Sequence, residues 1–205
     1  MVSLPVSLPF ILYEVAIRTG LRRGELCGLR WQDVSFTDRE LVVKVQLIEV
    51  GGVNFEGEIK TSSGQDRVVS LDDGLVDALA AWKLRQDEER DAWGAAYKDS
   101  GRVFTDEDGR ELKPRYVTRY FDTYALKAGL PKIRFHDLRH LHASLLISAG
   151  VPLAVVSKRL GHSTIAVTVD LYGHLLRDAN RDAAEAAAAM LVPRDRTAHT
   201  MHAQS

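Results

Sequence analysis

Apolar positions recur every three to four residues near the start of the chain, which is the spacing of one face of a helix. This pattern predicts a helix from Phe10 to Arg18, ended by Gly20, because glycine readily adopts the left-handed conformation that closes a helix. A second helix is expected from about Arg22 to Leu29. The chain therefore opens with two short helices joined by a tight glycine turn.

A strand-like stretch follows these helices. Residues Leu41 to Val50 are rich in Val, Ile and Leu, and Gly51-Gly52 then interrupts them, as expected for a hairpin turn. Together with Val53 to Lys60 and Arg67 to Leu71, this stretch predicts one small antiparallel sheet of three strands.

Helical patterns return after the strands. Asp72 is a good N-cap for a helix that runs through Trp82, and a short strand is expected at Val103-Phe104. Beyond it, Pro114 and Pro152 are each placed to open a helix. The sequence as a whole predicts an α+β fold that is mostly helical and carries a small three-stranded antiparallel sheet.

Composition fits an ordinary globular protein. The 205 residues are 45% hydrophobic and 27% charged. The apolar start is interrupted by Pro5, Pro9 and Glu14 and has no basic leader, so neither a signal peptide nor a membrane span is predicted, and the cytoplasm is the expected location. The single cysteine, Cys27, cannot form an internal disulfide and is expected to be a buried, inert thiol.

Charge is distributed unevenly along the chain. The formal net charge of -1 argues weakly against a nucleic-acid partner, because phosphate binding normally needs an excess of Lys and Arg. However, residues 72–109 hold 11 acidic and 5 basic side chains, whereas residues 110–161 hold 3 acidic and 10 basic ones. This asymmetry fits either one polyanion-facing side or an uneven solvated surface.

Several local motifs carry a family resemblance, and they occur in the family's order. They are Thr19-Gly20-Leu21-Arg22-Arg23-Gly24-Glu25-Leu26, Leu29-Arg30-Trp31-Gln32-Asp33, His136-Asp137-Leu138-Arg139-His140, Leu160-Gly161-His162-Ser163 and Tyr172-Gly173-His174. The chain resembles the catalytic domain of the tyrosine recombinases, the phage integrases and their relatives, over roughly residues 10–190. One such motif could arise by chance, but all of them in the right order make the resemblance specific.

The resemblance implies a complete catalytic set that needs no metal and no other cofactor. Its members would be Arg22, Lys60, His136, Arg139, His162 and Tyr172. In the family, the tyrosine attacks a DNA phosphodiester to give a 3'-phosphotyrosyl link, and a hairpin lysine protonates the 5'-oxygen that leaves. The two arginines and His162 would hold the phosphate, and His136 would manage protons and position.

The residue types suit this chemistry. Attack on a phosphodiester adds negative charge around phosphorus, and the planar guanidinium fork binds phosphate oxygens bidentately. A phenol with a pKa of about 10 is a poor nucleophile at neutral pH, so Tyr172 needs nearby cations and a proton acceptor. Arg22 is preferred to Arg23 because in the family the residue after Gly-Leu is the clamp, and Glu25 is expected to orient an arginine.

His140 has two other interpretations. With His136 it forms an i, i+4 pair that could begin a zinc site, but the glutamate of the metalloprotease motif and further ligands are missing. We therefore expect His140 to pack in the core or to support a neighbouring catalytic group.

The resemblance also implies an organisation of domains and partners. Residues 1–192 would form the catalytic domain, residues 193–205 a disordered tail, and the family's N-terminal core-binding domain would be absent. A helix over residues 175–191 would dock on a neighbouring protomer in a homotetramer on double-stranded DNA, with accessory directionality factors as possible partners. Two alternatives remain open: DNA relaxation of the type IB topoisomerase kind, and a non-catalytic DNA-binding accessory protein.

Overall fold

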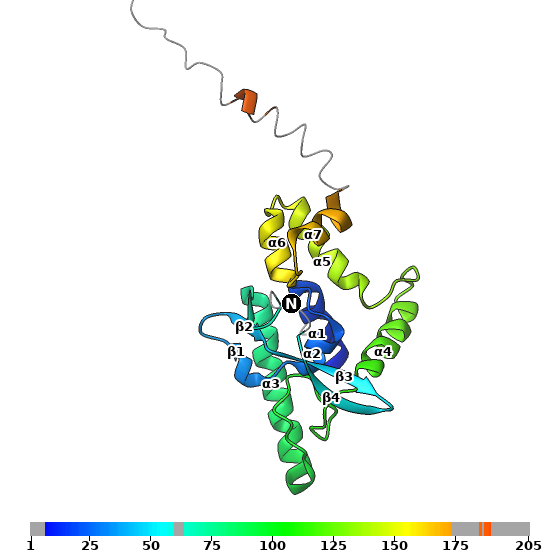
Figure 1. The fold of residues 1–205 in the computed structure, drawn as a ribbon. Helices are drawn as coiled ribbons and strands as arrows, with labels where there is room; N and C mark the ends of the chain where they lie inside the picture. The colour runs from blue at the N-terminus through cyan, green and yellow to red at the C-terminus, as the bar shows by residue number, and fades with distance from the viewer. Residues whose placement is uncertain (1–6, 60–63, 174–184, 186, 190–205) are drawn as a thin grey trace, which may run out of the picture.

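A computed structural model describes residues 7–59, 64–173, 185 and 187–189 of the chain. Its helices are α1 Leu8–Thr19, α2 Arg23–Gly28, α3 Asp73–Trp93, α4 Pro114–Lys127, α5 Asp137–Ser148, α6 Leu153–Leu160 and α7 Ile165–Tyr172. Short antiparallel strands lie between α2 and α3 (Figure 1). The mostly helical α+β class predicted from the sequence is confirmed.

The first two helices form as the sequence predicts. Helix α1 buries Ile11, Leu12 and Val15 and ends at Gly20, which has φ +68° and whose N–H donates to Ala16 O. Helix α2 begins directly afterwards, so the glycine turn joins two packed helices. Cys27 on α2 is fully buried, and burial raises the pKa of its thiol to about 12, as expected for an inert thiol.

The predicted single sheet is wrong, because the strands form two sheets. Strands β1 Val34–Ser35, β2 Glu40–Val43 and β5 Arg67–Ser70 pair in the order β1-β2-β5. Strands β3 Val45–Val50 and β4 Val53–Glu58 form a separate hairpin. The chain leaves the first sheet at Lys44, whose Nζ lies 2.7 Å from Asp33 Oδ1.

The second sheet follows helix α2 because two glycines let the backbones touch. A Cβ atom at Gly24 would lie 2.8 Å from Leu47 O, and one at Gly28 would lie 2.7 Å from Val45 O. Strand β3 therefore packs directly on α2, while β2 continues to pair with β5. The hydrophobic pattern along residues 41–50 is continuous, so it does not show that the chain bends at Lys44 from the first sheet into the second.

Helix α3 begins at the predicted cap, where Asp72 Oδ1 accepts the N–H of Leu75 at 3.1 Å. The short strand expected at Val103-Phe104 is wrong: the segment is a fully buried bend. Val103 O accepts N–H groups from Trp82 Nε1 at 2.6 Å and Gln86 Nε2 at 3.0 Å. Side chains of α3 therefore satisfy a backbone group that a strand would have paired in a ladder.

Two hydrophobic clusters divide the described residues. The larger joins α1, α2, strands that lie between α2 and α3, helices α3 and α4 and the start of α5, and the smaller joins the rest of α5 with α6 and α7. In Figure 1, α5, α6 and α7 gather at one end and α3 extends to the other. Pro114 and Pro152 open α4 and α6 as predicted. Within the described ranges, no helix is long and apolar enough to cross a membrane.

The C-terminal predictions remain untested. The expected tail over residues 193–205 lies outside the described residues, as does nearly all of the expected helix over residues 175–191.

Candidate active site

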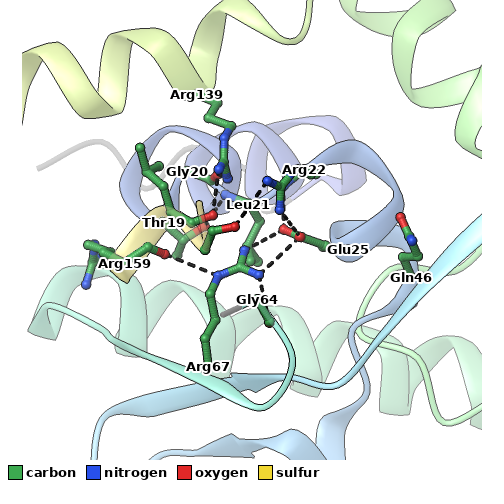
Figure 2. Close-up of polar contacts among 12 residues, drawn as sticks. Thr19, Gly20, Leu21, Arg22, Glu25, Gln46, Gly64, Arg67, Arg139 and Arg159 are labelled. Carbon is green, nitrogen blue, oxygen red and sulfur yellow. Dashed lines mark hydrogen bonds and ion pairs between the residues drawn. The ribbon is translucent and has the colours of Figure 1, made fainter. Parts of the chain in front are cut away.

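The carboxyl end of α6 gathers three arginines from three distant parts of the chain. Each of three consecutive carbonyls accepts an N–H from a different guanidinium. Figure 2 labels the three arginines and Arg159, which supplies the first carbonyl. The pairs are Arg67 Nε with Arg159 O at 3.2 Å, Arg139 Nη2 with Leu160 O at 2.5 Å, and Arg22 Nη2 with Gly161 O at 3.3 Å. The last carbonyls of a helix are unpaired within it and carry partial negative charge, so they favour cations.

A buried carboxylate holds two of these arginines. Glu25 Oε1 accepts from Arg22 Nη1 at 2.8 Å and Arg67 Nη1 at 3.1 Å, and Glu25 Oε2 accepts from the Arg22 backbone N–H at 2.8 Å and Arg67 Nη2 at 2.5 Å. Burial alone would raise the pKa of Glu25, but the hydrogen bonds and charge of Arg67, with the charge of Arg22, lower it to about 2. Glu25 therefore orients an arginine, as predicted, and orients a second one as well.

Arg139 connects the two hydrophobic clusters. Besides Leu160 O, its guanidinium donates to Gly20 O at 2.6 Å, so it joins α5 to the ends of α1 and α6. Gly20 is needed there, because a Cβ atom would lie 2.7 Å from His142 Cδ2. Burial, followed by the charge of Arg22, lowers the pKa of Arg139 to about 9, which leaves it protonated at neutral pH.

This arrangement has an excess of positive charge. Arg22, Arg67 and Arg139 carry three positive charges against the one negative charge of Glu25. Only Arg22 among the three is accessible, with 34% of its side chain exposed against 3% for Arg67. The cluster can therefore attract an anion and meet it first through Arg22.

His162 follows the same helix end. Its Nδ1 lies 2.8 Å from Thr168 Oγ1 on α7, and the residue is buried. Burial, followed by the charges of Arg139 and Arg22, lowers its pKa to about 4. The imidazole is therefore neutral at pH 7, and it can donate one N–H to a phosphate oxygen.

Tyr172 is the last residue of α7 and is 4% exposed. Its hydroxyl oxygen lies 2.7 Å from His140 Nδ1. Burial raises the pKa of the phenol, and the charge of Arg139 acts in the opposite direction. A buried phenol hydrogen-bonded to an imidazole can lose its proton to that imidazole when a substrate arrives.

His136 packs beside His140 instead of contacting the tyrosine through a hydrogen bond. The two rings meet edge to face with their centroids 5.0 Å apart. Partial burial, followed by the nearby charges of His140, Arg139 and Arg22, lowers the pKa of His136. Within the described part of the chain, no cluster of His, Cys, Asp or Glu side chains could hold a metal ion.

Five of the six predicted site residues lie around this one region, and the sixth, Lys60, lies outside the described residues. Arg23 points away and donates to Thr118 Oγ1 at 2.7 Å, which agrees with the preference for Arg22. Arg67 was not among the predicted site residues, whereas the contact of His140 with Tyr172 agrees with its expected role of supporting a neighbouring catalytic group. The sequence marks Arg67 only as the start of a strand, and the sequence signal for His140 is its i, i+4 spacing from His136.

Comparisons with known proteins agree with this geometry. The model of the Phage integrase family matches residues 9–178. The chain is 33% identical over 185 residues to "Tyrosine recombinase XerC-like" of Caldanaerobacter subterraneus subsp. tengcongensis, which covers 85% of this chain and 47% of that protein. It is 31% identical over 173 residues to "ICEBs1 integrase" of Bacillus subtilis, covering 84% of this chain and 46% of that protein. This chain thus spans about half the length of these relatives.

Solved structures show the same fold. The Tn1549 transposon integrase in complex with transposon right end DNA superposes with a TM-score of 0.74 at 25% identity, covering 87% of this chain and 58% of that one. The XerA recombinase has a TM-score of 0.59 at 23% identity and covers 95% of this chain and 66% of that one. From its motifs, its fold and the family match over most of its length, the chain belongs to the phage integrase family of tyrosine recombinases.

Proposed function

We propose that this chain is the catalytic part of a site-specific DNA recombinase, an integrase of a phage or another mobile element. The observation that carries the proposal is the excess positive charge of Arg22, Arg67 and Arg139 around one carboxylate, in the same site as the Tyr172 hydroxyl. A cluster of like charges beside a hydroxyl nucleophile is typical of functional sites.

The reaction would break one bond as it makes another. The Tyr172 oxygen would attack a DNA phosphorus, forming a phosphotyrosyl bond to the 3' side, and the bond from phosphorus to the 5'-oxygen would break. Arg22, Arg139 and His162 would stabilise the added charge on the non-bridging oxygens. Lys60 would protonate the departing 5'-oxygen. Attack by a 5'-hydroxyl would reverse these steps, with no external energy source.

The tyrosine proton would pass to His140. Its Nδ1 is within hydrogen-bond distance of the phenol oxygen, which is the first requirement for a general base. His136, against the His140 ring, would support that imidazole and take part in proton handling. This assignment extends the sequence-based one, in which His136 alone managed protons.

The partner would be double-stranded DNA, and the structures that the fold resembles include an integrase bound to transposon end DNA. A homotetramer on DNA, with the segment after Tyr172 docking on a neighbouring protomer, would couple the active sites. Accessory proteins could set direction, and action on DNA would place the protein in the cytoplasm.

The test is covalent capture of DNA. The protein would be incubated with a library of nicked duplexes whose sequence is randomised across the cleavage region, so that the short cleaved fragment diffuses away and the intermediate accumulates. We expect a DNA adduct that survives denaturing electrophoresis and maps to a peptide containing Tyr172.

The matched variant is Tyr172→Phe, which keeps the ring but removes the nucleophile. It should abolish the adduct and leave DNA affinity within about twofold, since no phosphate contact is lost. An adduct of equal yield in this variant would overturn the assignment of Tyr172. DNA binding without an adduct under any condition would favour the accessory-protein alternative, and resealing only to the original strand would favour the topoisomerase alternative.

A further inference from the structure

Arg67 is a buried arginine that the predicted catalytic set does not include. Its side chain is 3% exposed, and it bonds to Glu25, to Gly64 O at 3.3 Å and to Arg159 O at 3.2 Å. Burying a guanidinium is costly unless hydrogen bonds and an opposite charge compensate it. These contacts offset the cost of burying Arg67, and the groups that they join define the task of this side chain.

The contacts with Glu25 suggest what that task is. Each oxygen of the carboxylate accepts one N–H from Arg22 and one from Arg67, so the two arginines share one negative charge (Figure 2). With Arg22 as its sole partner, Glu25 would form a closed neutral pair, and Arg22 would have little net attraction for a phosphate. Because Arg67 takes part of that charge, the pair with Arg22 remains net positive.

The carboxyl end of α6 is shaped to admit Arg67. Gly161 has φ +67°, and a Cβ atom there would lie 3.0 Å from Arg67 Cδ and 3.2 Å from Arg67 Nε. The glycine between Leu160 and His162 therefore leaves the space through which the guanidinium of Arg67 reaches Glu25. Arg67 and Arg22 consequently bind the same helix end and the same carboxylate.

We propose that Arg67 is a positioning residue of the recombinase site: by sharing the Glu25 carboxylate with Arg22, it holds Arg22 in place and keeps that guanidinium net positive for a DNA phosphate. This inference rests on the proposed function. Arg67 itself does not touch the substrate, since its donors are directed at Glu25 and at backbone carbonyls.

The test is a pair of substitutions that distinguishes charge sharing from simple support. Arg67→Met should lower the single-turnover rate of covalent attachment to nicked DNA by about tenfold to a hundredfold, because Glu25 then neutralises Arg22. Glu25→Gln alone should also lower the rate, because Arg22 loses its anchor. The double variant, Arg67→Met with Glu25→Gln, should react at least threefold faster than Arg67→Met alone, because the negative charge that neutralises Arg22 is gone.

The matched control is Arg102→Met. Arg102 is an equally buried arginine, with 2% of its side chain exposed, and it bonds to Gly28 O, Glu56 and Glu111 away from the site. The Arg102→Met variant should lose stability without a comparable loss of the attachment rate per folded molecule. Adding Glu25→Gln should not raise its rate. If the losses from Arg67→Met and Glu25→Gln multiply, or Arg67→Met reacts at the wild-type rate, the inference is overturned.

A second measurement is independent of DNA. In ¹³C NMR titrations, the Glu25 carboxyl should have a pKa near 2 in the wild type, and Arg67→Met should raise it by at least one unit. Arg67→Lys keeps a positive charge but loses the planar guanidinium fork, so it should raise the pKa of Glu25 by less than Arg67→Met does. An unchanged pKa would overturn the inference, whereas absence of an adduct from the wild type would count against the proposed function alone.

Discussion

The hydrogen bond between His140 and Tyr172 leads to a prediction at the scale of single residues. His140→Leu should slow covalent attachment to nicked DNA by about a hundredfold or more, because the phenol loses its proton acceptor. His140→Asn places an amide oxygen near the position of Nδ1, so it should orient the hydroxyl without accepting its proton. Single-turnover rates of the three proteins, measured from pH 6 to 9, provide the comparison.

The Asn variant separates two roles of His140. If the imidazole accepts the proton, Asn should be nearly as slow as Leu at neutral pH and should recover as rising pH ionises the tyrosine. Equal DNA affinity in all three proteins would show that binding is intact. Wild-type rates in His140→Leu would mean that the ring only fills space.

The contacts that the sequence could specify join residues close together in the chain, whereas the contacts that it could not specify join distant ones. Glu25 lies three positions after Arg22, the N-cap of α2, as in a capping box, so the sequence alone places them together. Arg67 is 42 positions from Glu25, and His140 is 32 positions from Tyr172. Those two contacts exist only after the chain has folded, and no local pattern records them.

At the scale of elements, the end of α6 determines where the arginines lie, and Gly161 can test it. Gly161→Ala introduces a side chain at φ +67° and a Cβ atom 3.0 Å from Arg67 Cδ and Gly64 Cα. We expect a loss of about 2–4 kcal/mol of unfolding free energy, of which about 1–2 kcal/mol comes from the backbone conformation alone. Urea denaturation measures the total.

Gly150→Ala is the matched control for this element. Gly150 also follows a helix and has φ +78°, but a Cβ atom there would meet nothing within 4 Å. The Gly150→Ala variant should lose only the part of the unfolding free energy that comes from the backbone conformation, and it should keep its rate of covalent attachment. Gly161→Ala should lose attachment rate as well. Equal losses of unfolding free energy and of attachment rate in the two variants would show that the contact between residue 161 and Arg67 contributes to neither.

The elements also show why helices were predicted better than strands. A helix is closed by local signals, such as Asp72 at the start of α3 and Gly20 at the end of α1, and both act as predicted. Strand pairing depends on distant partners. The bend at Lys44 arises from contacts with α2, and the buried bend at Val103 arises from contacts with α3. The hydrophobic pattern contains neither contact, so it predicted one continuous strand at the first position and a paired strand at the second.

At the scale of the whole molecule, the site lies where the two hydrophobic clusters meet. Arg139 on α5 bonds to the end of α1 from the larger cluster and to the end of α6 from the smaller one. The packing of both clusters therefore brings positively charged guanidinium groups close together. Their repulsion raises the free energy of the folded protein, and a bound anion would lower it. The motif order in the sequence predicted this convergence of segments, although the average charge argued against a nucleic-acid partner.

The same burial predicts how the stability of the whole molecule depends on pH. His142 and His162 are buried, and burial with nearby arginines lowers the pKa of each from 6.5 to about 4. Between pH 6.5 and pH 4 the unfolded chain therefore binds more protons than the folded one, so stability must fall as the pH falls. For both histidines together we expect a loss on the order of 2–5 kcal/mol between pH 7 and pH 4.

Glu25 extends this loss to lower pH. Its folded pKa of about 2 lies below the value of 4.5 in an unfolded chain, so its contribution is present above pH 4.5 and is lost as the pH falls toward 2. Urea midpoints at pH 7, 5.5 and 4 would isolate the histidine range. His142→Gln, which removes one titrating group beside Arg159, should make the decline in that range less steep. A midpoint that stays constant from pH 7 to 4 would contradict the claim that these histidines are buried in neutral form, because a histidine kept neutral in the folded protein binds a proton when the chain unfolds in acid, and this favours unfolding.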